Sequence, residues 1–420
     1  MSKDSLPVCS QPVLGQLLSL IPRDIVSKCV ASTKADKWYK RLKTWDHLVF
    51  LVYGVLTKSS SLREIERNLL LFGNKIIHLG LKCIPKRSTV SDANKHRNSS
   101  VFGLIYSRLY QHYKGILSDS YLSLPIQGEI DPKRVEIFDS TTVTLFKDIF
   151  KGCGRIPKNG RRKGGLKAFS QMNLSEWVPN FVCLRDASTS ERSFLADVPL
   201  TQGSIAVFDK GFHKYEMYQE WTEMGIFYVT RMNDNAKFAI VKYNSIEEAC
   251  DIGVQTDAII ELAYQSSDKG QKMTRARLVA YIDPESGKRL TFLTNLMDTR
   301  AETICVLYKN RWHIETLFKQ IKQNFDLSHF LSDSPEGIKT QIWVALILNL
   351  IFTVIHRMTK QAEEFRTMVR LAAKNTTNHV GLMKFLCVGR DQSDGTTQNL
   401  DKMQLELFLQ YQETPLLRSP

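Results

Sequence analysis

The sequence predicts an α/β protein in which a helical N-terminal region precedes a core of alternating strands and helices. In residues 1 to about 125, apolar residues recur at helical spacing. From about residue 126 the pattern changes to short β-branched and aromatic runs that are typical of strands. Helical segments separate several of these strands, and such alternation indicates the α/β class.

The N-terminal region contains several helix starts. A densely apolar helix follows Thr44, which we expect to be its N-cap. The segment Ser61-Leu62-Arg63-Glu64 has the pattern of a capping box, and another helix begins at residues 88–91. A helix, a glycine-containing turn and a second helix with basic ends suit a DNA-reading module, so Lys95 and Arg97 are candidate DNA contacts. A solvated basic face is the commoner origin of such a cluster.

An acidic residue interrupts the first predicted strand. Asp139 lies in the middle of the run 135–145, although Asp is disfavoured in strands and costly to bury without a partner. A bound cation would offset that cost. Two further runs, 166–174 and 177–184, follow as neighbouring strands. Three adjacent strands with an acid on the first fit a ribonuclease H-like sheet.

A basic, glycine-rich loop at residues 158–165 separates the Asp139 strand from the next one. Its cations Arg161, Arg162 and Lys163 are candidates to hold a DNA backbone. Flexible charged loops are usually only solubilising, which is the alternative explanation.

A second acid ends the next strand. After helical residues around 190–200, the apolar run 204–208 leads to Asp209 and a glycine turn. Turn chemistry alone is an alternative explanation for this Asp. A helix through Trp221 and a strand at 226–231 continue the alternation.

The segment from about 232 to 300 is rich in short strands. We expect strands at 258–262, 276–282 and 290–296, separated by Asp-Lys-Gly and Pro-Glu-Ser-Gly turns. This β-rich segment separates Asp209 from a third acid.

The third acid belongs to a polar stripe on a predicted helix. Tyr308, Arg311, Glu315 and Lys322 follow one another at intervals of three, four and seven residues. On one helix they would lie within an arc of about 60°, beside an apolar stripe. Arg311 and Glu315 are four residues apart, so an intrahelical ion pair is the alternative explanation.

Three carboxylates that converge without a metal would repel and raise one another's pKa, so their convergence implies a divalent ion. Oxygen ligands favour Mg²⁺ or Mn²⁺ over zinc. Two such ions about 4 Å apart can activate the attacking oxygen and stabilise the leaving oxygen at a phosphodiester. The sequence therefore indicates phosphoryl transfer. It has no zinc-ligand spacing and no Walker loop, and we expect His313 to be packed or solvated.

Composition agrees with a polyanionic partner. The chain has 57 Lys and Arg against 43 Asp and Glu, a net charge of +14, although a ribosomal or membrane-surface protein could be equally basic. Eight scattered cysteines indicate reduced thiols in a cytosolic protein. The most apolar stretch, 342–355, is too short to span a bilayer, so we predict no membrane association and a buried helix that packs on the sheet.

The Y-x2-R-x3-E-x6-K spacing, with two acidic strands upstream, resembles the signature of the IS-four family of bacterial insertion-sequence transposases. The segments Ser-Leu-Arg-Glu-Ile-Glu and Lys-Arg-Ser-Thr-Val-Ser-Asp-Ala-Asn-Lys resemble the helical leader of some members. In the family the Glu is the last acid of a DDE triad. The resemblance therefore implies that Asp139, Asp209 and Glu315 are catalytic and hold two Mg²⁺ or Mn²⁺ ions.

The resemblance also implies DNA contacts. Tyr308, Arg311 and Lys322 would contact the phosphates beside the cleaved bond, and Lys210 is a further candidate cation. In some members an aromatic residue of a β-rich insertion stacks on a flipped base. Tyr281 or Phe292 would have to serve here, but aromatic residues in strands are ordinarily core, which is the interpretation we prefer.

These observations predict a division of the chain into three regions. They are a helical DNA-binding domain at 1–125, a ribonuclease H-like catalytic domain at 126–335, and a C-terminal helical region at 336–420 that completes the core and can mediate dimerisation.

The predicted activity is that of a transposase in the bacterial cytoplasm, associated with the nucleoid. It would hydrolyse the terminal inverted repeats of its element and use the freed 3′-OH to attack target DNA, as a homodimer in the synaptic complex and without a covalent protein intermediate. A metal-dependent nuclease without strand transfer and a domesticated, non-cutting DNA-binding protein remain alternatives.

Overall fold

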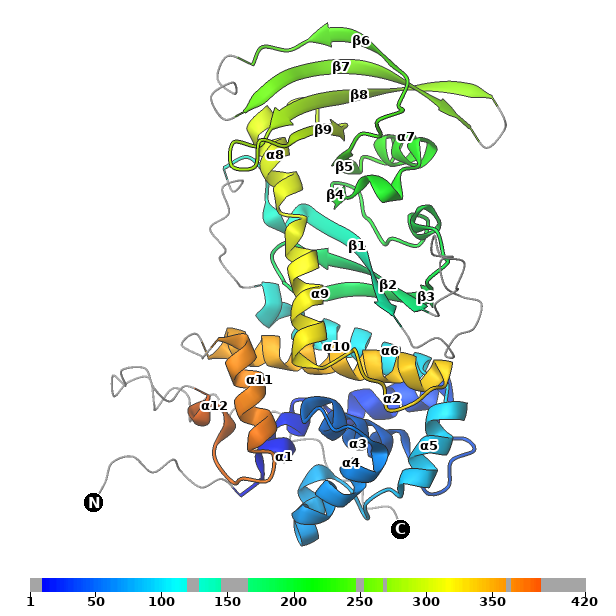
Figure 1. The fold of residues 1–420 in the computed structure, drawn as a ribbon, viewed down its shortest axis with the longest axis vertical. Coiled ribbons are helices and arrows are strands. Elements are labelled where there is room, and N and C mark those ends of the chain that lie inside the picture. Colours follow the sequence, from blue (N-terminus) through cyan, green and yellow to red (C-terminus); the bar gives the residue numbers. More distant parts are fainter. Residues whose placement is uncertain are drawn as a thin grey trace, which may run out of the picture. The chain divides into compact units, whose positions relative to one another are not determined.

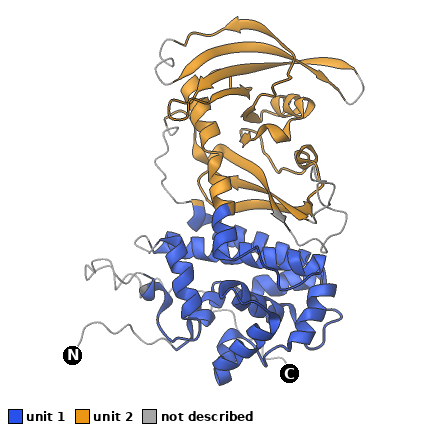
Figure 2. Ribbon diagram, viewed as in Figure 1, with its two compact units in different colours: residues 1–117, 319–420 blue, residues 118–318 orange. Residues whose placement is uncertain are grey.

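The structure is a computed structural model that describes residues 10–118, 128–144, 165–246, 253–266, 270–359 and 364–386. The chain divides into two compact units (Figure 2). Unit 1 comprises residues 1–117 and 319–420, and unit 2 comprises residues 118–318. The C-terminal region thus groups with the N-terminal helices.

The described part of unit 1 is helical (Figure 1). Its helices are α1 (Val13–Ser19), α2 (Arg23–Thr33), α3 (Thr44–Leu56), α4 (Leu62–Leu69), the 3₁₀ segment η1 (Leu70–Leu79), α5 (Arg87–His96), α6 (Ser100–Ser118), α10 (Pro335–Met358), α11 (Phe365–Lys374) and α12 (Leu382–Phe385). Helix α9 (Trp312–Asn324) begins in unit 2 and ends in unit 1.

Capping of α3 differs from the expectation. Thr44 is the first helical residue, and its hydroxyl donates to Asp36 Oδ1 instead of capping the helix. The side chain of Asp46 accepts from the backbone N–H of Lys43, the N-cap, at 3.1 Å. For α4 the Ser61 half of the predicted capping box is confirmed, because Ser61 Oγ accepts from the backbone N–H of Glu64. The Glu64 carboxylate, however, accepts from the backbone N–H of Ser60, not from that of Ser61.

Helix α10 forms the core of unit 1. It packs against α3, α5 and α11 of the same unit, and the expectation that it packs on the sheet of unit 2 stays a prediction. Trp343 of α10 lies against Gly103 of α6, where an added Cβ would be 2.9 Å from the indole. By length and composition α10 could cross a membrane, but 89% of its apolar window is buried inside the structure.

Unit 2 is built on one mixed sheet with the strand order β3-β2-β1-β4-β5-β9-β8-β7-β6. The strands are β1 (Val135–Thr144), β2 (Gly165–Asn173), β3 (Pro179–Asp186), β4 (Ile205–Phe208), β5 (Phe227–Arg231), β6 (Phe238–Tyr243), β7 (Val254–Gln265), β8 (Gln271–Ile282) and β9 (Arg289–Thr294). Strand β4 pairs parallel with β1 and β5, and the other pairs are antiparallel. The sequence-based α/β class is confirmed.

Helices and short turns connect and cover the sheet. They are the 3₁₀ turns η2 (Pro132–Arg134), η3 (Glu191–Phe194) and η4 (Lys210–Phe212), and the helices α7 (Tyr215–Glu223), α8 (Ala301–Lys309) and the start of α9. The expected helical stretch at 190–200 is only the single turn η3. Aromatic side chains from β1, β4, η3, η4 and α7 form a core cluster on one face of the sheet.

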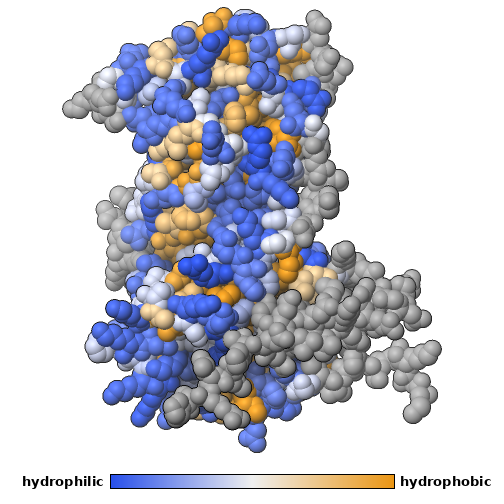
Figure 3. Space-filling view, turned by 180° about the vertical axis from the view of Figure 1, so that it is seen from behind, coloured by the Kyte–Doolittle hydropathy of each residue, from blue (hydrophilic) through white to orange (hydrophobic). Residues whose placement is uncertain are grey.

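The edge strand β6 was not expected from the sequence, and all six of its residues are exposed. Its pairing with β7 slips between Ile240 and Lys242, so Val241 is an extra, bulged residue. Bulges at edge strands hinder pairing with a second sheet, which suits an edge that exposes apolar side chains. Figure 3 shows hydrophobic side chains dispersed among hydrophilic ones over this part of unit 2.

Candidate active site

The pairing of β1 with β4 places two of the predicted acids side by side. Ile137 is aligned with Val207 in the parallel register, and Asp139 and Asp209 each stand two residues further on. Because neighbouring strands lie about 4.8 Å apart, both carboxylates belong to the same small region of the sheet.

Both acids face away from the aromatic core. Successive strand residues point to opposite faces, and Phe138 and Phe208, which precede the acids, stack at 4.6 Å within the core cluster. Asp139 and Asp209 therefore point to the other face, where residues from α8 and α9 meet them.

The third acid comes from the start of α9, but the expected continuous helix is interrupted. Helix α8 ends at Lys309 and α9 begins at Trp312, with a tight turn at Asn310 and Arg311 between them. Within this turn the backbone N–H of Arg311 donates to Tyr308 O, three residues back. The expected single helix through Tyr308, Arg311, Glu315 and Lys322 is therefore wrong, because Tyr308 belongs to α8, Arg311 to the turn, and Glu315 and Lys322 to α9.

The turn nevertheless directs the signature side chains of unit 2 toward the acids. Tyr308 donates its hydroxyl to Asp209 Oδ1 at 2.9 Å. Nη1 of Arg311 lies 3.1 Å from Asp139 Oδ2 and 2.6 Å from Glu315 Oε1. All three predicted acids are thus tied into one polar cluster by two neighbouring signature residues.

Burial and charge shape the electrostatics of this cluster. The pKa of Asp139 is raised to about 6, chiefly by burial. Arg311 and the Ser140 N–H, which donates at 2.7 Å, oppose this rise, while Glu315 and Asp209 contribute to it. Burial likewise raises the pKa of Tyr308 well above its ordinary value, so its hydroxyl remains a donor. For Arg311, burial opposes ionisation, but nearby groups including Asp139 and Glu315 outweigh burial and raise its pKa.

The donor chemistry of the cluster fits a divalent cation. Its ligating atoms are carboxylate oxygens, which hard ions such as Mg²⁺ and Mn²⁺ prefer. In the described residues no three His, Cys, Asp or Glu side chains are grouped closely enough to hold a metal as they stand. The guanidinium of Arg311 supplies the positive charge between two of the acids instead, so a cation already occupies this place.

Sequence reasoning missed Glu191, which braces the segments that carry both aspartates. Its Oε1 accepts from Ser140 Oγ at 2.8 Å and from Lys167 Nζ at 3.2 Å. Its Oε2 lies so close to Gly211 that an added Cβ would overlap it. Ser140 follows Asp139, and Gly211 is two residues from Asp209. No motif marks Glu191, because its role comes from the packing of η3 against η4.

Other predicted residues of unit 2 lie near the cluster. Lys210 forms an ion pair with Asp234 at 3.2 Å. His313 stacks on Trp177 with 4.3 Å between ring centroids, which confirms that it is packed. Phe292 is 1% exposed, and its ring packs against that of Tyr308 with 4.8 Å between the ring centroids. The prediction that Phe292 is a core residue is therefore confirmed.

The remaining candidates have different surroundings. Lys322 lies on α9, two turns beyond Glu315, in the part of the helix assigned to unit 1, and burial lowers its pKa. Lys95 is exposed in the last turn of α5. Arg161, Arg162 and Lys163 lie outside the described residues.

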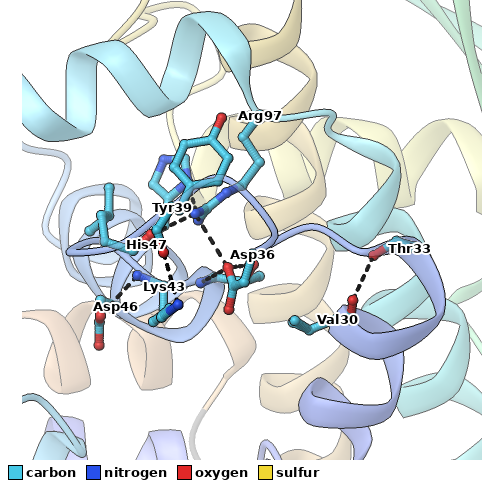
Figure 4. A network of polar contacts seen from close by, with 10 residues as sticks. Val30, Thr33, Asp36, Tyr39, Lys43, Asp46, His47 and Arg97 are labelled. Carbon is cyan, nitrogen blue, oxygen red and sulfur yellow. Dashed lines mark hydrogen bonds and ion pairs between the residues drawn. The ribbon is translucent and has the colours of Figure 1, made fainter.

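Arg97 is not available for DNA, which corrects the sequence-based expectation. It is 2% exposed and donates to Leu42 O at 2.6 Å, with Asp36 Oδ1 at 3.4 Å (Figure 4). Its guanidinium also lies over the Tyr39 ring and meets His47 Nδ1 at 3.3 Å. This arginine holds the segment before α3 to the end of α5.

A mixed α/β sheet and the start of a helix thus supply two aspartates and a glutamate to one polar cluster, with an arginine and a tyrosine among them. The family model described as "Transposase DDE domain" matches residues 131–350, more than half of the chain, and the chain belongs to this family. It is therefore a DNA transposase, which binds DNA and depends on a divalent metal ion. A second model, "Domain of unknown function (DUF4372)", matches residues 9–82.

Relatives agree with this assignment. A protein described as "Putative transposase y4zB" of Sinorhizobium fredii is 27% identical over 285 residues, which cover 66% of this chain and 73% of the relative. A probable transposase for insertion sequence element IS5377 of Geobacillus stearothermophilus is 26% identical over 245 residues, which cover 55% of this chain and 59% of the relative. The expected resemblance to insertion-sequence transposases is confirmed. Among solved structures, a piggyBac transposase synaptic complex with hairpin DNA is similar with a TM-score of 0.45 and 10% identity, over 93% of this chain and 85% of that one.

Proposed function

We propose that this transposase cleaves the terminal inverted repeats of an insertion sequence and joins the freed 3′-OH ends to target DNA. The observation that carries the proposal is the convergence of Asp139, Asp209 and Glu315 through Arg311 and Tyr308. Helix and strand residues far apart in the sequence are thereby linked in one polar cluster, from which two metal ions could act on a phosphodiester.

The catalytic core is proposed to be ribonuclease H-like. The order β3-β2-β1-β4-β5 supports this, with β1 to β3 antiparallel and β4 parallel to both neighbours. Strands β6 to β9 would be the insertion between the second and third acids. Residues 1–125 are proposed as the DNA-binding domain and 126–335 as the catalytic domain, with 336–420 as a helical region that can contribute to dimerisation.

Asp139, Asp209 and Glu315 are proposed to hold two Mg²⁺ or Mn²⁺ ions. When bound, such ions would activate the attacking oxygen and stabilise the leaving oxygen. The chain's own residues supply the rest. The register of β1 and β4 fixes the two aspartates, Glu191 braces the segments after them, and Tyr308 orients the Asp209 carboxylate.

Tyr308, Arg311 and Lys322 are the proposed phosphate contacts beside the scissile bond, with Lys210, Lys95 and the loop cations Arg161, Arg162 and Lys163 as outer contacts. Arg311 offers a planar fork for phosphate oxygens, and lysines offer point charges. The bacterial cytoplasm and nucleoid, where the element's DNA lies, are the proposed place of action.

A cleavage assay tests the triad. We expect purified protein with Mg²⁺ or Mn²⁺ to nick DNA carrying the element's ends, while Asp139→Ala, Asp209→Ala and Glu315→Ala abolish nicking and still bind DNA. A variant that cleaves at nearly the wild-type rate would remove that residue from the site.

A joining assay separates transposition from simple cleavage. Labelled, pre-cut ends are incubated with supercoiled target DNA and the metal ion, and joined products are counted. A protein that nicks but never joins is a nuclease, and the proposed strand transfer would then be wrong.

A further inference from the structure

Arg311 holds the position between carboxylates that a metal ion would need. Its Nη1 contacts Asp139 and Glu315 together, at 3.1 and 2.6 Å, and its side chain is only 8% exposed. We propose that Arg311 is a built-in counter-cation of the Asp139 and Glu315 carboxylates, and that its release from them couples metal binding to the binding of a DNA phosphate. This inference rests on the proposed function and concerns how metal binding and DNA binding at its site depend on each other.

Charge balance argues for competition between Arg311 and the metal ions. Asp139, Asp209 and Glu315 bring three negative charges when ionised, and Arg311 neutralises one of them at close range. A divalent cation on the same carboxylates would face the guanidinium as a like charge. Such repulsion is strong where burial limits screening, so the arginine and the ion cannot both use these oxygens at full strength.

The resting contacts of Arg311 leave one of its donors unused. Among the residues that the structure describes, its Nε is buried without a hydrogen-bond partner. A buried, unpaired donor is costly, and a guanidinium matches phosphate oxygens with two parallel hydrogen bonds. A backbone phosphate would therefore offer a partner to Arg311 Nε, which the contacts with Asp139 and Glu315 do not use.

The surroundings of Arg311 provide a route away from the acids. The residue lies in the turn between α8 and α9, where the regular helical hydrogen bonding is interrupted. Its guanidinium carbon is 5.6 Å from the centroid of the Tyr308 ring and 5.4 Å from that of Trp312, which is 58% exposed. A cation can move along aromatic faces without losing all of its attraction.

Coupling of this kind is reciprocal. If the metal ion loosens Arg311 from the acids, it frees the guanidinium for a phosphate, and a phosphate that captures Arg311 opens the acids to metal. Without DNA, wild-type protein should then bind metal ions weakly. Removing the guanidinium should strengthen metal binding in the absence of DNA, although it harms catalysis.

The experiment measures Mn²⁺ binding to the full chain without DNA, by the electron paramagnetic resonance signal of free Mn²⁺. Arg311→Gln is compared with wild type and with Arg289→Gln, which removes the same charge from an exposed position on β9. We expect Arg311→Gln to bind Mn²⁺ about fivefold more tightly or better, the lower end of typical coupling factors. Arg289→Gln should bind as wild type does.

Thermal unfolding gives an independent measurement. In EDTA, Arg311→Gln should melt below wild type because its carboxylates lack their counter-ion, and Mn²⁺ should raise its melting temperature more than that of wild type. Arg311→Lys keeps the positive charge but lacks the planar guanidinium, so it should show a smaller gain in Mn²⁺ affinity than Arg311→Gln. It replaces Arg311→Gln in the measurement if that variant does not fold.

The outcomes separate this inference from the proposed function. Equal or weaker Mn²⁺ binding by Arg311→Gln, in a protein whose wild type still cleaves and joins DNA, overturns the counter-cation role alone. If Arg311→Gln binds Mn²⁺ more tightly and this gain disappears when Asp139→Asn is added, both the counter-cation role and the metal assignment are supported. A gain that survives Asp139→Asn places the ion elsewhere, and overturns the metal assignment together with this inference.

Discussion

Gly211 offers a sharp test of how the aspartate-bearing segments are held together. A Cβ added at this position would overlap Glu191 Oε2. That oxygen cannot move aside freely, because Glu191 is held by Ser140 at 2.8 Å and by Lys167 at 3.2 Å. Overpacking of a well-packed site costs about 1–3 kcal/mol, so we expect Gly211→Ala to destabilise unit 2 by this amount.

The measurement is thermal unfolding combined with the strand-cleavage assay. For a unit of this size each kcal/mol corresponds to about 2–4 °C in Tm. Gly115→Ala is the matched control: Gly115 lies in α6, where no atom would meet an added Cβ, and the exchange should be neutral or stabilise by about 0.5–1 kcal/mol. Cleavage should fall only in Gly211→Ala, since Asp209 is two residues away.

A double-mutant cycle identifies the cause. Glu191→Ala removes the obstructing oxygen, so Gly211→Ala should cost less in that background, with a coupling of about 0.5–3 kcal/mol. If Gly211→Ala costs the same with and without Glu191, the close approach of this carboxylate is not the reason for the glycine.

Three further predictions concern chemistry, assembly and pH. Arg311→Lys should reduce strand cleavage or joining more than about tenfold, about 1.4 kcal/mol, with the fold intact; wild-type kinetics would show that Arg311 acts only as an ion pair with Glu315. Light scattering after size exclusion should find a dimer or larger complex with end DNA, because the DNA neutralises the repulsion between chains of +14 each; excision by a complex of one chain and one end would contradict this. Burial, with Arg97 nearby, lowers the pKa of His47 from 6.5 to about 3 in the folded protein. As the pH falls below 6.5, His47 becomes protonated in the unfolded chain but not in the folded one. The free energy of unfolding therefore decreases by up to about 1.4 kcal/mol per pH unit between pH 6.5 and about 3. Denaturant unfolding of His47→Gln should lack this part of the pH dependence.

The chemistry of the site was more accessible from the sequence than its geometry. Asp139 and Asp209 could be found because acids are rare within apolar strands, and Glu315 because of its spacing from Arg311. Periodicity could not reveal the turn at Asn310 and Arg311, since the side-chain pattern continues across it. Two polar contacts from different elements therefore converge where one helical stripe was expected.

Burial of charged residues was the main source of error. Arg97 belongs to a basic cluster in the sequence, but the structure buries it among Leu42, Asp36 and Tyr39. Only the tertiary contacts distinguish it from Lys95, which is exposed in the preceding turn. Glu191 was missed for the related reason that its partners lie on other strands and turns.

The pairing of β5 with β9 has a consequence for any attempt to shorten this protein. Val229, Thr230 and Arg231 are bonded in register to β9, and Thr294 donates its side-chain hydroxyl to the backbone of Tyr228. Strands β6 to β9 thus continue the sheet that carries the aspartates. Deletion of residues 232–300 would make β5 an edge strand with unpaired backbone groups, and such edges promote aggregation by pairing with other chains. A miniature version would need a replacement strand to close that edge, so this segment is not a detachable module.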